Sequence, residues 1–276
     1  MATKQFKEMS FLGHLEELRW LLVRSSAAVV TMAVVSYFFA DYIFTELIFG
    51  PTDPSFITYR LFCEASHSLG FADSICITKL NFIIQNTEME GQVNIFCWIC
   101  ITAGFILAFP YILWEFWKFI SPALYEKERK GAKLFIFLAS ILFFLGVLFG
   151  YYIIVPMSVN FLATFSISSI VKNQFSVDSY VSMVRTAVVA SGLFFELPII
   201  IYFLTKLGLV TPGFLRKYRK YAVVIVLIVA AIVTPPDVVS QVTVAIPMLL
   251  IYEASIWISV FVEKNKKRDA LTSRSI

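Results

Sequence analysis

The chain has 276 residues, of which 59% are hydrophobic and only 15% are charged, and its formal net charge is +4. Soluble domains are roughly 45 to 50% apolar and about 25% charged, so a water-soluble enzyme is nearly excluded. The 28 Phe, 12 Tyr and 5 Trp would leave large apolar patches in water. The composition therefore predicts an all-α integral membrane protein in a lipid bilayer.

Long runs with few charges predict the membrane spans, because about 20 mainly apolar residues cross a hydrocarbon core of about 30 Å. Six transmembrane helices are expected, at about 20–40, 92–116, 134–156, 184–205, 221–234 and 242–262. The fifth is short, because its 14 residues reach only about 21 Å. Repeats and flexible linkers are absent from the sequence, so residues 1–276 are expected to form a single membrane domain.

Basic residues predict the orientation. Most of the 23 Lys and Arg lie before the first span, at 118–133, at 206–220 and after the last span. The positive-inside rule then places both termini in the cytoplasm and makes residues 41–91 an external loop. The apolar stretch from Ala27 to Ala40 has no A-x-A cleavage site after it, so it is interpreted as a retained first helix. We expect a multi-pass membrane protein, which in a bacterium would lie in the inner (plasma) membrane.

Cysteines and histidines give weak signals. Cys63 and Cys76 lie in the external loop, where a disulfide and two buried thiols are both open interpretations. Cys97 and Cys100 form a C-x-x-C inside an apolar run and are expected to act as small hydrophobic residues. With two His and no nucleotide, zincin or hydrolase motif, neither an enzyme, a metal site, a cofactor nor nucleic-acid binding is predicted.

Two acidic residues lie at positions that suggest a function. Glu17 lies on a predicted amphipathic helix, whose apolar face is expected to contain Phe11, Leu12, Leu15, Leu18 and Leu22. Glu128 lies in a basic cluster that should keep it ionised. Glu17 could instead belong to the solvated charged face of an interfacial helix. An aromatic membrane belt and a helix restart at Pro122 would account for the surroundings of Glu128, but not for Glu128 itself.

Two further acids are expected within the membrane. Glu196 lies near the middle of the fourth span beside Pro198, and faces either a bundle interior or watery cavity, or an interhelical hydrogen bond. Gln241 and Glu253 on the last helix should seek hydrogen bonds from a neighbouring or partner helix.

Four motifs in order carry a family resemblance. They are HLEELR at 14–19, FISPALY at 119–125 with Glu128-Arg129, FELP at 195–198, and TPPD at 234–237 with Ser240-Gln241 and AIPM at 245–248. Together they resemble TatC, the twin-arginine protein translocase subunit. The resemblance covers about 11–262 but not 51–91, a loop longer than is usual in the family, to which no role is carried over.

The resemblance implies two binding surfaces. Twin-arginine signal peptides of folded cargo would bind at the cytoplasmic face, through Glu17, Arg19, Phe119, Pro122, Leu124, Tyr125 and Glu128. TatA/TatB-type single-span subunits would dock near helices five and six, at Pro235, Pro236, Asp237, Gln241 and Glu253, and self-association is also expected. A carboxylate pairs bidentately with guanidinium, which favours arginine over lysine in the signal. The first motif departs from the family in having Trp20 directly after Arg19.

Two rival interpretations come from other classes. Glu196 could be a proton or cation relay in a secondary transporter, but the sequence lacks the repeated halves typical of such proteins. An intramembrane enzyme would need a nucleophile with its base or a metal ligand set, and neither pattern is found in the sequence.

The short fifth helix also suggests local bilayer thinning.

Overall fold

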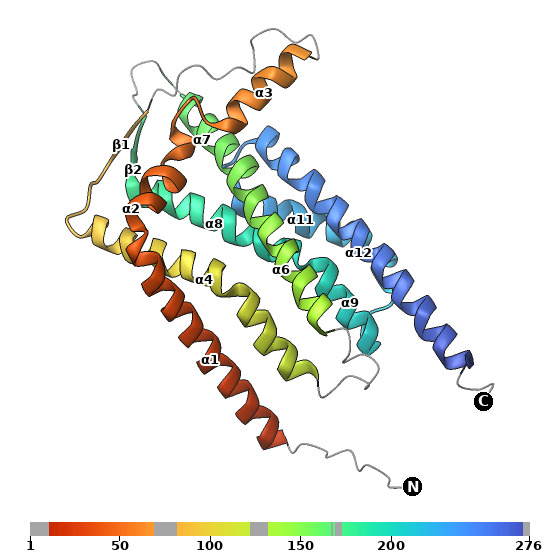
Figure 1. The fold of residues 1–276 in the computed structure, drawn as a ribbon. Helices are drawn as coiled ribbons and strands as arrows, with labels where there is room; N and C mark the ends of the chain where they lie inside the picture. Colours follow the sequence, from red (N-terminus) through yellow and green to blue (C-terminus); the bar gives the residue numbers. More distant parts are fainter. Residues whose placement is uncertain (1–10, 69–81, 122–131, 167, 169–172, 273–276) are drawn as a thin grey trace. The chain divides into compact units, whose positions relative to one another are not determined.

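The computed structural model describes residues 11–68, 82–121, 132–166, 168 and 173–272, and these are mostly helical (Figure 1). Within these ranges, five helical segments are long and apolar enough to cross a membrane: Leu15–Phe38, Gly91–Ile120, Leu134–Thr164, Val177–Leu207 and Ser240–Lys266. Each overlaps one predicted span. The prediction of a helical membrane protein with several spans is therefore confirmed.

The helices form two compact units. The first contains Met1–Phe38 and Cys100–Ser140, and the second contains Phe39–Ile99 and Ile141–Ile276. In the first unit, α1 (Phe11–Phe38) packs on α4 (Gly91–Ile120). The two helices approach closely at Gly104, where a Cβ atom would lie 2.6 Å from the backbone nitrogen of Ala33. Trp117 of α4 contacts Phe135 of α6 (Ala132–Phe149), with 5.0 Å between ring centroids.

The leucine-rich face of α1 is not packed against the rest of the chain. Leu15, Leu18 and Leu22 are exposed, whereas Leu21 is buried. Lipid is as apolar as these side chains, so in a membrane the leucine-rich face can meet the bilayer while a more polar face packs on a neighbouring helix.

In the second unit, a π-helical segment η5 (Gly150–Ile154) joins α6 to α7 (Val155–Thr164), and these pack against α8 (Val177–Phe195). The Ser191 hydroxyl donates to the Gly146 carbonyl oxygen over 2.8 Å. Gly150 lies so close to Ser191 that a Cβ atom there would overlap its hydroxyl. The small side chains thus allow close helix packing, as is common in membrane proteins.

The carboxyl-terminal part contains α9 (Leu197–Leu207), α10 (Pro212–Lys217), α11 (Arg219–Val233) and α12 (Val238–Thr272). Ile201, Leu215 and Ile256 form a core cluster among them. Helix α9 ends at Gly208, whose φ of 81° suits glycine. Helix α11 has 15 residues and so reaches only about 22 Å. A short helix was predicted here.

The described part of the segment predicted as an external loop is largely helical. It contains α2 (Ala40–Tyr42), η1 (Ile43–Ile48), η2 (Gly50–Thr52) and α3 (Ile57–Ser68). Tyr59 is buried there, and its hydroxyl donates to the carbonyl oxygens of Pro51 at 2.9 Å and Pro156 at 3.2 Å. Burial raises the pKa of Tyr59.

The all-α prediction also needs a small correction. Strands β1 (Ile83–Gln85) and β2 (Gln174–Ser176) pair in parallel, with Ile84 opposite Phe175. Three residues are too few to show the alternation by which a strand is recognised in a sequence.

The cysteines were only partly predictable. Cys63 lies on α3 and is disulfide-bonded, whereas Cys76 lies outside the described residues, so their pairing stays a prediction. Cys97 and Cys100 are free cysteines on α4, and Cys100 is buried.

Candidate functional site

One face of α1 combines an exposed acid with an ion pair. Glu17, Leu21 and Arg24 are spaced i, i+4, i+7 and therefore share this face. Leu21 is buried and Glu17 is exposed. Arg24 contacts α4, where its Nε lies 3.0 Å from Oε2 of Glu115. The face that carries Glu17 is thus the side of α1 directed at α4.

Glu115 is the central residue of this contact, and the sequence reasoning missed its role. Its side chain is only 1% exposed, and its Oε1 accepts a hydrogen bond from Lys118 Nζ over 2.7 Å. A buried carboxylate is tolerated only when cations or donors compensate it. The available signal was that Glu115 is the one acid in the sequence from Gly91 to Ile120, one helical turn before Lys118.

The predicted signal-binding residues are only partly described. Phe119 is half-buried near the end of α4, in the same compact unit as Glu17. Arg19 is exposed, but two residues after Glu17 it projects from about the opposite side of the helix. Pro122, Leu124, Tyr125 and Glu128 lie outside the described residues. The structure therefore places Glu17 on the side of α1 that carries the Arg24–Glu115 pair with α4, whereas Arg19 projects elsewhere.

Glu196 lies at a break between α8 and α9. Its side chain is 5% exposed, and Pro198 occupies the first turn of α9. Proline cannot donate a backbone hydrogen bond, which explains why the helix is interrupted here. Among the described residues, the Glu196 carboxyl group has no hydrogen-bond or ion-pair partner. The interhelical hydrogen bond considered from the sequence is thus not found within the described ranges.

The predicted partner-subunit residues make contacts within the α11–α12 pair. Gln241 Nε2 donates to the Leu227 carbonyl oxygen over 3.1 Å, and Glu253 Oε2 pairs with Arg219 at 2.7 Å. Asp237 caps α12, since its Oδ2 accepts from the backbone N–H of Ser240 at 2.7 Å. These polar groups stabilise the helical hairpin, while Arg219 and Glu253 stay about half exposed.

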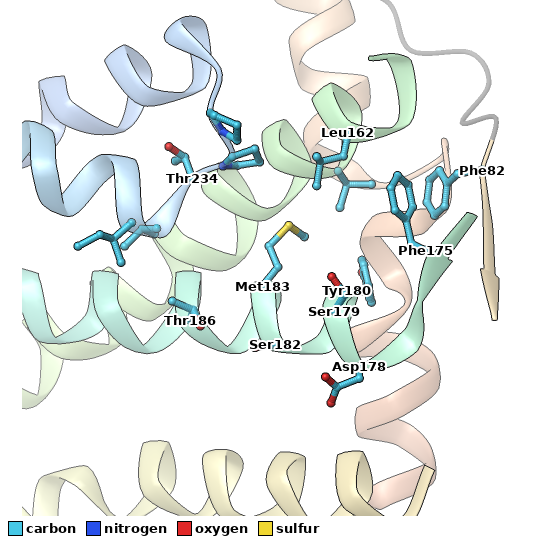
Figure 2. A pocket seen from close by; sticks show the side chains of 15 residues that line it. Phe82, Leu162, Phe175, Asp178, Ser179, Tyr180, Ser182, Met183, Thr186 and Thr234 are labelled. Atoms are coloured by element: carbon cyan, nitrogen blue, oxygen red, sulfur yellow. The ribbon is translucent and has the colours of Figure 1, made fainter. Parts of the chain in front are cut away.

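A hollow of about 520 Å³ lies beside this hairpin, within the second unit (Figure 2). It is lined by α7, α8, the end of α11 with the turn that follows it, β2 and the residue before β1. Phe82 and Phe175 lie side by side at one end, with 5.5 Å between ring centroids, and Thr234 lies at the other (Figure 2). Pro235 and Pro236, predicted as partner contacts, also line it. The lining is mainly apolar and suits an apolar side chain or a lipid chain.

Metal chemistry receives no support from the described ranges, in which no group of three or more His, Cys, Asp or Glu could hold an ion. Several membrane-length helices, a buried paired carboxylate and a mainly apolar hollow define a multi-pass membrane protein.

Comparison with known proteins identifies the family. Residues 13–247 match the family of the Sec-independent protein translocase protein, TatC. The chain is 44% identical over 264 residues to the TatC protein of Blattabacterium sp. subsp. Periplaneta americana, covering 94% of this chain and 98% of that protein. It is 35% identical over 260 residues to the Aquifex aeolicus protein of the same name, with 94% and 98% covered.

Solved structures agree with the sequence relatives. A crystal structure of the twin-arginine translocase receptor TatC matches with a TM-score of 0.70 and 34% identity, covering 91% of this chain and 99% of that one. A second structure of that receptor gives a TM-score of 0.71 and 35% identity, with 89% and 99% covered. The chain belongs to the TatC family, and the resemblance seen in its four motifs is confirmed.

Proposed function

We propose that this chain is the receptor subunit of a twin-arginine translocase, which binds twin-arginine signal peptides at the cytoplasmic membrane face. One observation carries the proposal: exposed Glu17 shares a helix face with Arg24, which is paired to α4 just before Phe119. This face leaves the Glu17 carboxylate available to a guanidinium group. Glu128 would supply the second carboxylate, with Phe119, Pro122, Leu124 and Tyr125 beside it.

The position of Arg19 on α1 indicates that it does not bind the same part of the ligand as Glu17. Because it projects from about the opposite side of α1, a ligand held by Glu17 does not reach it from the same side. Arg19 would instead contact another part of the signal peptide, or a lipid phosphate.

The proposal includes the topology and assembly of the chain. All of 1–276 would form one membrane domain with six spans, α11 included, and both termini in the cytoplasm. TatA/TatB-type subunits would dock on the α11–α12 hairpin around Pro235, Pro236, Asp237, Gln241 and Glu253, and copies of the chain would associate. The support is the half-exposed Arg219–Glu253 pair and the adjacent apolar hollow.

Short α11 would thin the bilayer around the complex, because about 22 Å is less than a hydrocarbon core of about 30 Å. Inserting four leucines into α11 should then slow cargo export while leaving assembly intact. Unchanged export in the assembled complex would contradict the thinning.

A binding experiment tests the receptor role. The full chain in detergent is titrated with a twin-arginine signal peptide and with its twin-lysine counterpart. We expect Glu17→Gln to weaken binding of the arginine peptide about fivefold, the upper end for an exposed charge pair, and Glu128→Gln to weaken it as well. Glu16→Gln is the matched control, because Glu16 is exposed on α1 but projects from another face. Full affinity in both Glu17→Gln and Glu128→Gln would refute the carboxylate clamp.

A further inference from the structure

Arg185 is a charged residue within the membrane-length segment Val177–Leu207. Its guanidinium carbon lies 4.7 Å from the ring centroid of Trp98 on α4. No carboxylate or carbonyl oxygen of the described residues pairs with it. A charge in such a segment is expensive and normally has a partner. The Trp98 ring covers one face of the guanidinium group, and the N–H donors at its edge stay available.

Asp178 lies on the same side of α8 as Arg185. The two are seven residues apart, which places them within about 20° of each other around the helix and about 10 Å apart along it. Asp178 is one of the residues that line the hollow, and Figure 2 shows its carboxyl group on the opposite side of the α8 ribbon from Met183. Side chains on a helix lean toward its N-terminus, so the long Arg185 side chain extends toward Asp178.

We propose that Arg185 and Asp178 bind the headgroup of a phospholipid that carries a phosphate and a primary ammonium, the phosphatidylethanolamine class. Arg185 holds the phosphate by charge-assisted hydrogen bonds. Asp178, closer to the start of α8, accepts from the ammonium, which lies farther from the hydrocarbon than the phosphate. Trp98 is about half exposed and suits the interface level at which both groups meet.

Charge around the site favours this headgroup over others. Glu88 and Glu90 directly precede α4 in the sequence and Asp178 lies in the first turn of α8, and acids at these helix starts disfavour a headgroup with net negative charge. A choline headgroup has a cation but no N–H, so it cannot donate to the Asp178 carboxylate. Only the leaflet depends on the proposed topology, which makes it the outer one; the headgroup chemistry does not.

Lipid titration of the full chain tests the site. The purified protein in detergent is incubated with phosphatidylethanolamine, phosphatidylglycerol or phosphatidylcholine of identical acyl chains, and bound lipid is counted by native mass spectrometry. We expect a preference for phosphatidylethanolamine. Arg185→Gln should lower its apparent affinity about fivefold, the equivalent of about 1 kcal/mol per basic residue near a membrane surface. Asp178→Asn should remove the preference over phosphatidylcholine while retaining phosphate-dependent binding.

Lys206→Gln is the matched control, because Lys206 also lies over an aromatic ring, 5.3 Å from the centroid of Tyr202, but at the other end of the α8–α9 segment. It should leave the preference unchanged. Equal retention of the three lipids by the unchanged chain, or full retention by Arg185→Gln, would overturn the proposal. If Arg185→Gln does not fold, Asp178→Asn carries the test alone, because an unchanged preference for phosphatidylethanolamine over phosphatidylcholine in that variant would also overturn the proposal. Signal-peptide binding in these samples reports separately on the receptor role.

Discussion

Two buried carboxylates in membrane-length helices have opposite surroundings. Glu115 in α4 is 1% exposed and contacts two cations, Arg24 and Lys118. Glu196, between α8 and α9, is 5% exposed and has no partner among the described residues. A buried charge must be compensated. The burial of Glu115 is explained by its two ion pairs, of which the one with Arg24 joins α1 to α4. Glu196 is not explained in this way, which makes it the better candidate for a contact that forms only in an assembly or during transport.

The largest effect is expected from Glu115. Glu115→Ala removes the carboxylate that joins two cations and leaves the α1–α4 contact with positive charge alone. Arg24 and Lys118 are about half exposed and can turn toward water, so the expected loss is about 2 kcal/mol of unfolding free energy rather than the full cost of an unpaired buried charge. Thermal unfolding in detergent measures it.

A double-mutant cycle separates the ion pair from simple truncation. Adding Arg24→Ala to Glu115→Ala should cost less than the sum of the two single changes, because they share one interaction. Glu16→Ala controls for loss of an exposed acid in the same unit. Strict additivity of the two changes would show that Arg24 and Glu115 do not stabilise each other.

The same comparison shows what the sequence could and could not predict. Charge-free runs located the spans, since hydrocarbon thickness sets their length, and Pro235-Pro236 bounded the short α11. The buried side of α1 could not be predicted, because the hydrophobic pattern does not distinguish a lipid-facing side from a helix-facing one. Glu115 was overlooked for a related reason: its importance comes from Arg24, which lies 91 residues earlier in the chain.

At the candidate site too, the sequence predicted some residues, while the contacts of others depend on the fold. The motifs indicated Glu17 and Phe119, but the first motif also grouped Arg19 with Glu17, although two residues that are two positions apart on a helix project to about opposite sides. For Gln241 and Glu253, the sequence predicted that each would form hydrogen bonds, but not with which group. Their partners, the Leu227 carbonyl and Arg219, depend on how α12 packs against α11.

A smaller effect is expected from the pair between α11 and α12. Arg219 and Glu253 are 51% and 40% exposed, so solvent screens their attraction. Glu253→Gln should lower the unfolding free energy by at most about 1 kcal/mol, and 0.5 M salt should reduce the difference. A loss as large as that of Glu115→Ala would mean that exposure does not distinguish the two ion pairs.

The smallest effect on stability is expected at Glu196. Glu196→Gln keeps the shape of the side chain and breaks no hydrogen bond to a described residue, so the unfolding free energy of the isolated chain should change by less than about 0.5 kcal/mol. Export of a folded reporter by the assembled translocase should nevertheless fall, because an amide replaces a carboxyl group that a partner or cargo would contact. Glu196→Asp, with a shorter carboxyl group, tests whether reach matters as well as charge. If Glu196→Gln destabilises the isolated chain as much as Glu115→Ala, then Glu196 has a partner within the chain and the contrast between the two carboxylates fails.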